Sequence, residues 1–110
     1  MAADPRTDER IQQLLKPFHG FERKKMFGGT GFLLSGNMCV GVWKEFIILR
    51  VGVDAAERML QQRGMKPFDI TGKAMKGWVM AEPDTFETDI ALRELIDTAI
   101  EFVLTLPPKG

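Results

Sequence analysis

Residues 23–31 read Arg-Lys-Lys-Met-Phe-Gly-Gly-Thr-Gly, a basic run that passes through two large apolar residues into a cluster of glycines. This order predicts a strand that enters at the rim of a sheet and bends where a side chain would be in the way. We expect that strand to run from Lys25 to Leu34. The elements on either side of it must then pack on the sheet that it begins.

Apolar segments that follow this stretch predict a meander of antiparallel strands. Ser35-Gly36-Asn37 has the composition of a tight turn, and Gly36-Asn37 suits a two-residue hairpin loop before a strand over residues 38–43. Lys44-Glu45 forms the next predicted turn. Residues 46–51 come after it and are the segment richest in β-branched and aromatic side chains. The result is a predicted three-stranded meander.

Helical patterns lie on both sides of the meander. The first predicted helix spans about 5–16, and a third, capped by Thr88, carries a broad apolar stripe. Between them, Asp54 and Glu57 have the spacing of a capping box, which predicts a short helix ending near Arg63. The residues expected to face inward from this short helix are Ala56, Met59 and Leu60.

A second hairpin is predicted between the last two helices. Residues 67–70 and 77–81 are short strand-like segments, and residues 71–76 between them have turn composition and two lysines. The predicted element order is therefore α-β-β-β-α-β-β-α. Runs of hairpins with helices between them indicate a single α+β domain, residues 1–110, on a mainly antiparallel sheet packed by helices.

Length and composition restrict the class of protein. The chain has 110 residues, of which 45% are hydrophobic and 27% charged, as in one soluble globular domain. No apolar run approaches the roughly 20 residues that span a bilayer. The N-terminus is too polar for a signal peptide, so we expect a cytoplasmic protein without membrane contact. Fifteen basic and fifteen acidic residues cancel, which disfavours direct DNA binding.

The motif Met26-Phe27-Gly28-Gly29, preceded by the basic run and followed by Gly31-Phe32, resembles the signature of the TfoX N-terminal domain family. The family is named after a bacterial regulator of DNA-uptake competence, also called Sxy. Other similar features are Gly36-Asn37-Met38, Leu49-Arg50-Val51, Lys66-Pro67-Phe68 and Gly77-Trp78. The resemblance covers about residues 21–106 and implies the same α+β fold and a regulatory context linked to transcription. Longer members carry a second, helical domain, which we expect this chain to lack.

The glycine-rich stretch leaves two interpretations open. Gly28 and Gly29 beside Lys24 and Lys25 would suit a phosphate-bearing small molecule or nucleotide, because glycines let backbone N–H groups approach an anion. The lysines precede the glycines, unlike in a P-loop, and Leu34 takes the last glycine position of GxGxxG. The alternative is that the glycines serve backbone geometry and close packing.

A patch of basic and aromatic side chains is the second candidate site. Its predicted members are Arg23, Lys24, Lys25, Phe27, Lys73, Lys76 and Trp78. Basic residues interleaved with aromatic ones suit an acidic protein partner or single-stranded nucleic acid. The alternative is a set of charges that are simply solvated.

The sequence has no pattern typical of catalysis or metal binding. Cys39 stands within a predicted strand, where a small core residue is expected rather than a redox switch. His19 is the only histidine and is expected at the surface or in a capping role. We therefore expect a non-enzymatic interaction domain without cofactor or metal, whose partner is a protein in a regulatory complex. A homodimer would be one way to cover the edges of the sheet.

Overall fold

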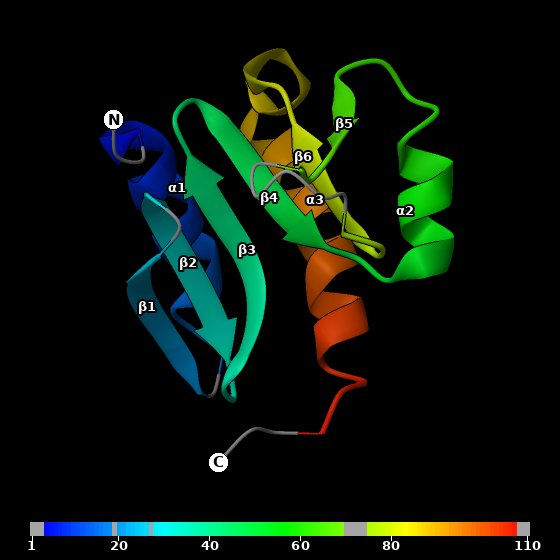
Figure 1. Ribbon diagram of the computed structural model, residues 1–110. Helices are drawn as coiled ribbons and strands as arrows, with labels where there is room; N and C mark the ends of the chain where they lie inside the picture. The colour runs from blue at the N-terminus through cyan, green and yellow to red at the C-terminus, as the bar shows by residue number, and fades with distance from the viewer. Residues whose placement is uncertain (1–3, 19, 27, 70–74, 108–110) are drawn as a thin grey trace.

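The computed structural model describes residues 4–18, 20–26, 28–69 and 75–107. Its strands form one six-stranded sheet in the order β1-β2-β3-β4-β6-β5, and every neighbouring pair is antiparallel (Figure 1). Along the chain the elements are α1 (Pro5–Leu15), β1 (Phe21–Met26), β2 (Gly29–Leu34), β3 (Asn37–Trp43), β4 (Phe46–Arg50), α2 (Val53–Met59), β5 (Met65–Pro67), β6 (Trp78–Ala81), the 3-10 helix η1 (Pro83–Phe86) and α3 (Asp89–Val103).

The α+β class and the mainly antiparallel sheet are confirmed, but the sheet has one strand more than predicted. The single strand expected over 25–34 is a hairpin, in which β1 pairs with β2 from Phe21 opposite Leu34 to Met26 opposite Gly29. Gly28, at φ +76°, lies in the turn. The prediction missed β1 because this strand is at the sheet edge, where charged side chains replace the apolar alternation of a central strand.

The two predicted turns of the meander are present, and one of them is shifted. Ser35 and Gly36 make the β2–β3 turn, with φ of +51° and +82°, so it lies one residue earlier than the Gly36-Asn37 loop that was predicted. Gly36 supplies the left-handed conformation easily, while Asn37 opens β3. The Lys44-Glu45 turn is confirmed, since Trp43 pairs directly with Phe46.

Helix boundaries were predicted with mixed success. The Thr88 cap is confirmed, because its hydroxyl oxygen accepts a hydrogen bond from the N–H of Ala91 at 3.1 Å. The capping box at Asp54 is wrong: α2 begins directly after Gly52, which has φ +87° and no side chain to cap the helix. This helix also ends at Met59 instead of near Arg63. In the second hairpin, β5 begins two residues before the predicted strand over 67–70 and ends at Pro67. Residue 70 lies outside the described residues.

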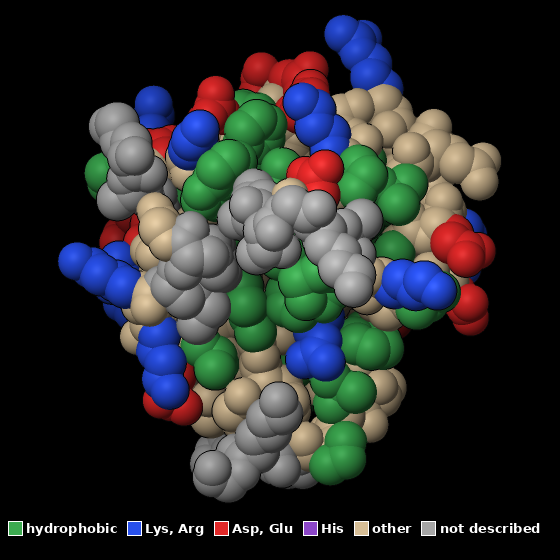
Figure 2. All heavy atoms as spheres, in the orientation of Figure 1, with side chains coloured by type: hydrophobic (Ala, Val, Ile, Leu, Met, Phe, Trp, Pro, Cys, Tyr) green, Lys and Arg blue, Asp and Glu red, His purple; other side chains and the backbone are tan. Residues whose placement is uncertain are grey.

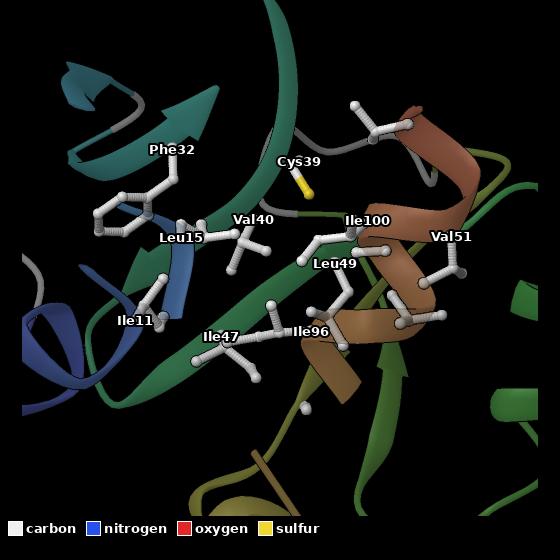
Figure 3. Packing of buried hydrophobic residues seen from close by; sticks show 14 of the residues in the cluster. Ile11, Leu15, Phe32, Cys39, Val40, Ile47, Leu49, Val51, Ile96 and Ile100 are labelled. Atoms are coloured by element: carbon white, nitrogen blue, oxygen red, sulfur yellow. The ribbon is translucent and has the colours of Figure 1, made fainter. Parts of the chain in front are cut away.

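The main core lies between the sheet and the two longer helices, α1 and α3. Both helices cover the same face of the sheet (Figure 1), and their apolar residues meet strand residues that alternate toward them (Figure 3). Members of this cluster include Ile11, Leu15, Phe32, Val40, Ile47, Leu49, Ile96 and Ile100. Burying such side chains supplies roughly 1.5–3 kcal/mol each toward folding. The opposite face carries a smaller cluster of Ile48, Phe68 and Met80, flanked by Trp43 and Trp78.

Cys39 is a core residue, as predicted. The register shifts between Phe32 opposite Val40 and Leu33 opposite Met38, so Cys39 is the extra residue of a β-bulge and joins the main core. Burial raises the pKa of its thiol to about 12 and outweighs the positive charge of Arg50, which lowers it. A thiol in this environment is not ionised at neutral pH.

Gly29 provides a test of the β2–β3 packing. We expect Gly29→Ala to lower the free energy of unfolding by about 1–3 kcal/mol, because a Cβ atom there would collide with the Val42 carbonyl oxygen of β3. Urea denaturation measures the change. Gly28→Asn is the control, since no described atom crowds that position and Asn tolerates its positive φ. Wild-type stability in Gly29→Ala would contradict this close contact between strands.

Candidate interaction surfaces

The predicted basic and aromatic patch does not form as one surface. Arg23, Lys24 and Lys25 lie on β1 at one edge of the sheet, whereas Lys76 and Trp78 belong to the second hairpin near the other edge. Three strands separate β1 from β6, which at a spacing of about 4.8 Å places them about 19 Å apart. Phe27 and Lys73 lie outside the described residues.

The three cations of β1 also differ in direction and in role. Successive strand residues point to opposite faces, so Arg23 and Lys25 face the side of the helices and Lys24 faces the other side. The Arg23 guanidinium donates two hydrogen bonds to the Asp8 carboxylate of α1, Nε to Oδ1 at 3.0 Å and Nη2 to Oδ2 at 2.6 Å. Arg23 is therefore part of the contact between α1 and β1, and of these three cations only Lys24 and Lys25 have no ion pair with a described residue.

Asp8 is nearly buried, and its environment favours the ionised form. Burial alone raises the pKa of the Asp8 carboxyl, but hydrogen bonds from Arg23 and Gln12, together with the positive charge of Arg23, outweigh that effect and hold the pKa below its usual value. Thr30 lowers it further. The paired carboxylate thus ties the first turns of α1 to the edge of the sheet.

The structure explains why glycine occupies positions 28 and 29 beside these lysines. Gly29 packs against the backbone of Val42 and Trp43, which leaves no room for a side chain. Gly28 occupies a turn with positive φ. Since Lys24 and Lys25 point to opposite faces of β1, they do not converge with the two glycines on one anion. This geometry favours the backbone interpretation over the phosphate site.

A different surface, which we call the α2–β6 groove, gathers exposed apolar side chains. It is a hollow of about 360 Å³, lined by Val53, Ala56, Glu57, Leu60, Pro67, Met75, Lys76, Gly77 and Trp78. Figure 1 shows the elements that supply these residues, α2 and the strands β5 and β6. Val53, Leu60 and Met75 are 49%, 37% and 41% exposed. The expectation that Leu60 faces inward is therefore wrong. Ala56 and Met59 do face inward and are buried.

Backbone hydrogen bonds and ring contacts connect the walls of the α2–β6 groove. Val51 and Gly52 donate backbone hydrogen bonds to the Gly77 carbonyl at 2.9 and 3.1 Å, which fixes the start of α2 against the start of β6. The Trp78 ring contacts Phe68 at a centroid distance of 5.6 Å, and the Arg50 guanidinium lies 5.4 Å from its centroid. An apolar partner would therefore meet a preformed surface.

Sequence reasoning found Lys76 and Trp78 but missed the rest of this groove. The signal was the spacing of Val53, Ala56, Glu57 and Leu60, which puts four residues on one face of α2. The other face of α2 is buried in the core through Met59 and Ala56, and Ala56 lies at the border between the two faces. A short helix with more apolar surface than its core contact uses is typical of a binding wall.

Two other hollows of the described surface have mixed charge. One of about 570 Å³ is lined by residues including Asp54, Arg58 and Glu101, and one of about 540 Å³ by Arg6, Arg10 and Glu87. Arg10 already donates to the Phe86 carbonyl at 2.8 Å. Figure 2, in the orientation of Figure 1, shows hydrophobic side chains between charged ones on the face opposite the helices. Within the described ranges, no three His, Cys, Asp or Glu residues are grouped as metal ligands.

In a comparison with protein families, the model of the TfoX N-terminal domain matches residues 13–103. The chain belongs to the TfoX N-terminal domain family. This confirms the resemblance first carried by residues 26–29. Comparison with curated proteins and with solved structures gave no match. None of the helices in the described part of this TfoX N-terminal domain has the length and apolarity needed to cross a membrane.

The family match includes both sheet edges and the α2–β6 groove, but it begins after Asp8. The ion pair between Asp8 and Arg23 therefore joins a residue outside the matched range to one inside it. In this TfoX N-terminal domain, the first half of α1 is tied to the matched part through a contact whose strength depends on the ionised state of Asp8.

That dependence can be measured. The pKa of Asp8 is lowered in the folded state, so its contribution to stability is present above the unfolded pKa and is lost as pH falls through the folded pKa. We expect Asp8→Asn to lower the free energy of unfolding by about 1–2 kcal/mol at pH 7, an estimate that allows for the partly exposed Arg23. The difference from wild type should shrink below about pH 4.

Urea denaturation at pH 7 and at several lower pH values tests this expectation. Glu9→Gln is the matched control, because Glu9 lies on the exposed side of α1 and has no ion pair among the described residues. An Asp8→Asn effect that stays constant across the acid range would show that the ionised carboxylate is not its source.

Proposed function

We propose that this TfoX N-terminal domain is a non-enzymatic protein interaction domain, and that the α2–β6 groove receives apolar side chains of a partner protein. The observation that carries the proposal is the exposure of Val53, Leu60 and Met75 around one preformed hollow. Large apolar side chains that remain exposed beside one another favour a protein contact over contact with water alone.

The lining of the groove favours a protein over a small charged metabolite. Among the described residues that line it, only Glu57 and Lys76 carry charge, and they have opposite signs. Covering an exposed Leu, Val or Met side chain contributes on the order of 1 kcal/mol each at these exposures. Apolar anchors in a rigid groove with a polar rim are the usual centre of a protein interface.

Two further points support a role without catalysis. The Cys39 thiol is buried with a pKa of about 12, so it is unsuited to act as a nucleophile. Lys24 and Lys25 do not converge with the glycines on one anion site. The only histidine, His19, lies outside the described residues.

The partner is, in this proposal, a component of a regulatory complex linked to transcription or competence. The family membership supports this context. The formal net charge of zero supports contact with proteins rather than independent binding to DNA. A second copy of the chain is another protein able to cover an apolar groove, and it is an outcome that the experiment distinguishes.

The test compares two double variants of the tagged chain in affinity capture from lysate of its source cell, with nuclease present. We expect Leu60→Ser/Met75→Ser to weaken partner binding roughly tenfold or more, because two apolar contacts are lost. Ile90→Ser/Leu104→Ser is the matched control, since both residues are exposed and lie outside the groove. Calorimetry with the purified partner gives the change in affinity.

Support for the proposal requires that a transcription component is captured, and that it is lost with the groove variant and retained with the control. Equal capture by both variants would refute the groove as the contact. Recovery of the chain alone, with a dimer that only the groove variant dissociates, would replace the partner by a second copy. Turnover of a metabolite at a defined rate would overturn the non-enzymatic role.

A further inference from the structure

The edge of the sheet formed by β1 is a second surface, separate from the α2–β6 groove. The sheet has two edge strands, β1 and β5. β5 has three residues and ends in Pro67, which lacks a backbone N–H. β1 has six residues and no proline, and alternate residues of an edge strand turn their N–H and C=O groups away from the sheet. Only β1 therefore offers a full strand edge for pairing.

The charges along this edge are not balanced within the described part of the chain. The side chains of Glu22, Arg23, Lys24 and Lys25 are all exposed. Arg23 is neutralised by Asp8, while Lys24 and Lys25 have neither an ion pair nor a hydrogen bond from their side chains to described residues. Since these two lysines alternate, each face of the edge carries one lysine without an ion pair; Glu22 lies two residues from Lys24 on the same face, whereas Lys25 has no acidic neighbour on its face of β1.

We propose that the β1 edge receives an extended acidic segment of a partner protein as an added strand. Backbone hydrogen bonds to the outward N–H and C=O groups of β1 would align the segment. An added strand lies about 4.8 Å away, and directly opposite side chains on one face are about 5 Å apart. Two adjacent carboxylates, which alternate in the same way, would then meet Lys24 on one face and Lys25 on the other.

Charge decides between this occupant and the others that an open edge could take. A second copy paired antiparallel about Arg23 would set each Glu22 opposite Lys24 of the other copy, but it would place Lys25 opposite Phe21, without an acidic partner. The phosphates of nucleic acid could accept hydrogen bonds from the lysines and from the N–H groups of the edge, but they have no hydrogen to donate to its C=O groups. An acidic extended segment uses both features at once. The inference does not depend on the groove, which lies toward the other end of the sheet.

Synthetic peptides as long as the six residues of β1 provide the test. The probe has two adjacent glutamates flanked by valines; a second peptide has glutamines in place of the glutamates; a third keeps the glutamates but carries N-methyl groups on alternate backbone nitrogens. Each is titrated into the uniformly ¹⁵N-labelled full chain, with amide shifts and hydrogen exchange followed by NMR. The protein variants are Lys24→Glu/Lys25→Glu, Lys24→Gln/Lys25→Gln and the control Arg63→Glu/Arg93→Glu, whose exposed arginines lie off β1.

We expect the acidic probe to shift the amide signals of β1 and to slow their hydrogen exchange. The glutamine and N-methyl peptides should bind with an affinity at least about tenfold lower. Both lysine variants should lose binding by a similar factor, the arginine control should retain it, and Leu60→Ser/Met75→Ser should bind the probe like wild type. Equal binding of the N-methyl peptide would overturn strand addition. Unchanged binding by both lysine variants, shifts confined to other elements, or a β1-mediated dimer that excludes the probe would overturn the proposal as well.

Discussion

The arrangement of this domain depends on the packing of α1 and α3 against a single face of a six-stranded sheet. The helices meet strands β2, β3 and β4 in one continuous apolar cluster, where residues such as Phe32, Val40 and Leu49 are fully buried. The central strands thus receive most of the burial. The ends of the sheet receive less, and β1 is held to α1 partly by a polar contact, the ion pair between Asp8 and Arg23.

That uneven coverage explains why both candidate surfaces lie away from the sheet centre. At one end, β1 keeps an unpaired edge whose residues are charged and exposed. At the other end, α2 packs with Ala56 and Met59 in the core and leaves Leu60 beside the second hairpin. A helix of seven residues is too short to cover that end completely. Binding capacity therefore follows from what the core leaves uncovered.

Much of the fold could be predicted from the sequence because the core elements have strong local patterns. Residues 46–51 and the final helix after Thr88 were placed correctly, since β-branched content and capping chemistry act over a few residues. The β1 strand was missed for the opposite reason. Its charged residues carry no apolar alternation, and its strand conformation is decided by pairing with β2, which local patterns do not reveal.

The candidate site was harder to predict because it depends on distances across the sheet. Arg23 reads as a free cation in the sequence, yet its partner Asp8 is fifteen positions away on another element. Lys76 and Trp78 lie close together at the start of β6, but the sequence analysis grouped them with cations from the far edge of the sheet. Only the strand order separates them. The apolar wall formed by Leu60 likewise required knowing which side of α2 the core had already used.

The two candidate surfaces differ in chemistry as well as in position, so contacts at them should respond differently to salt. The α2–β6 groove is mainly apolar and selects by shape, whereas the β1 edge combines backbone hydrogen bonds with positive charge. Three strands lie between β1 and β6, so an occupant of one surface does not cover the other. High salt should then weaken contacts at the edge more than contacts in the groove, because exposed charges are screened and apolar burial is not. The two proposals together therefore imply that one domain would hold two unlike segments at once, at opposite ends of its sheet.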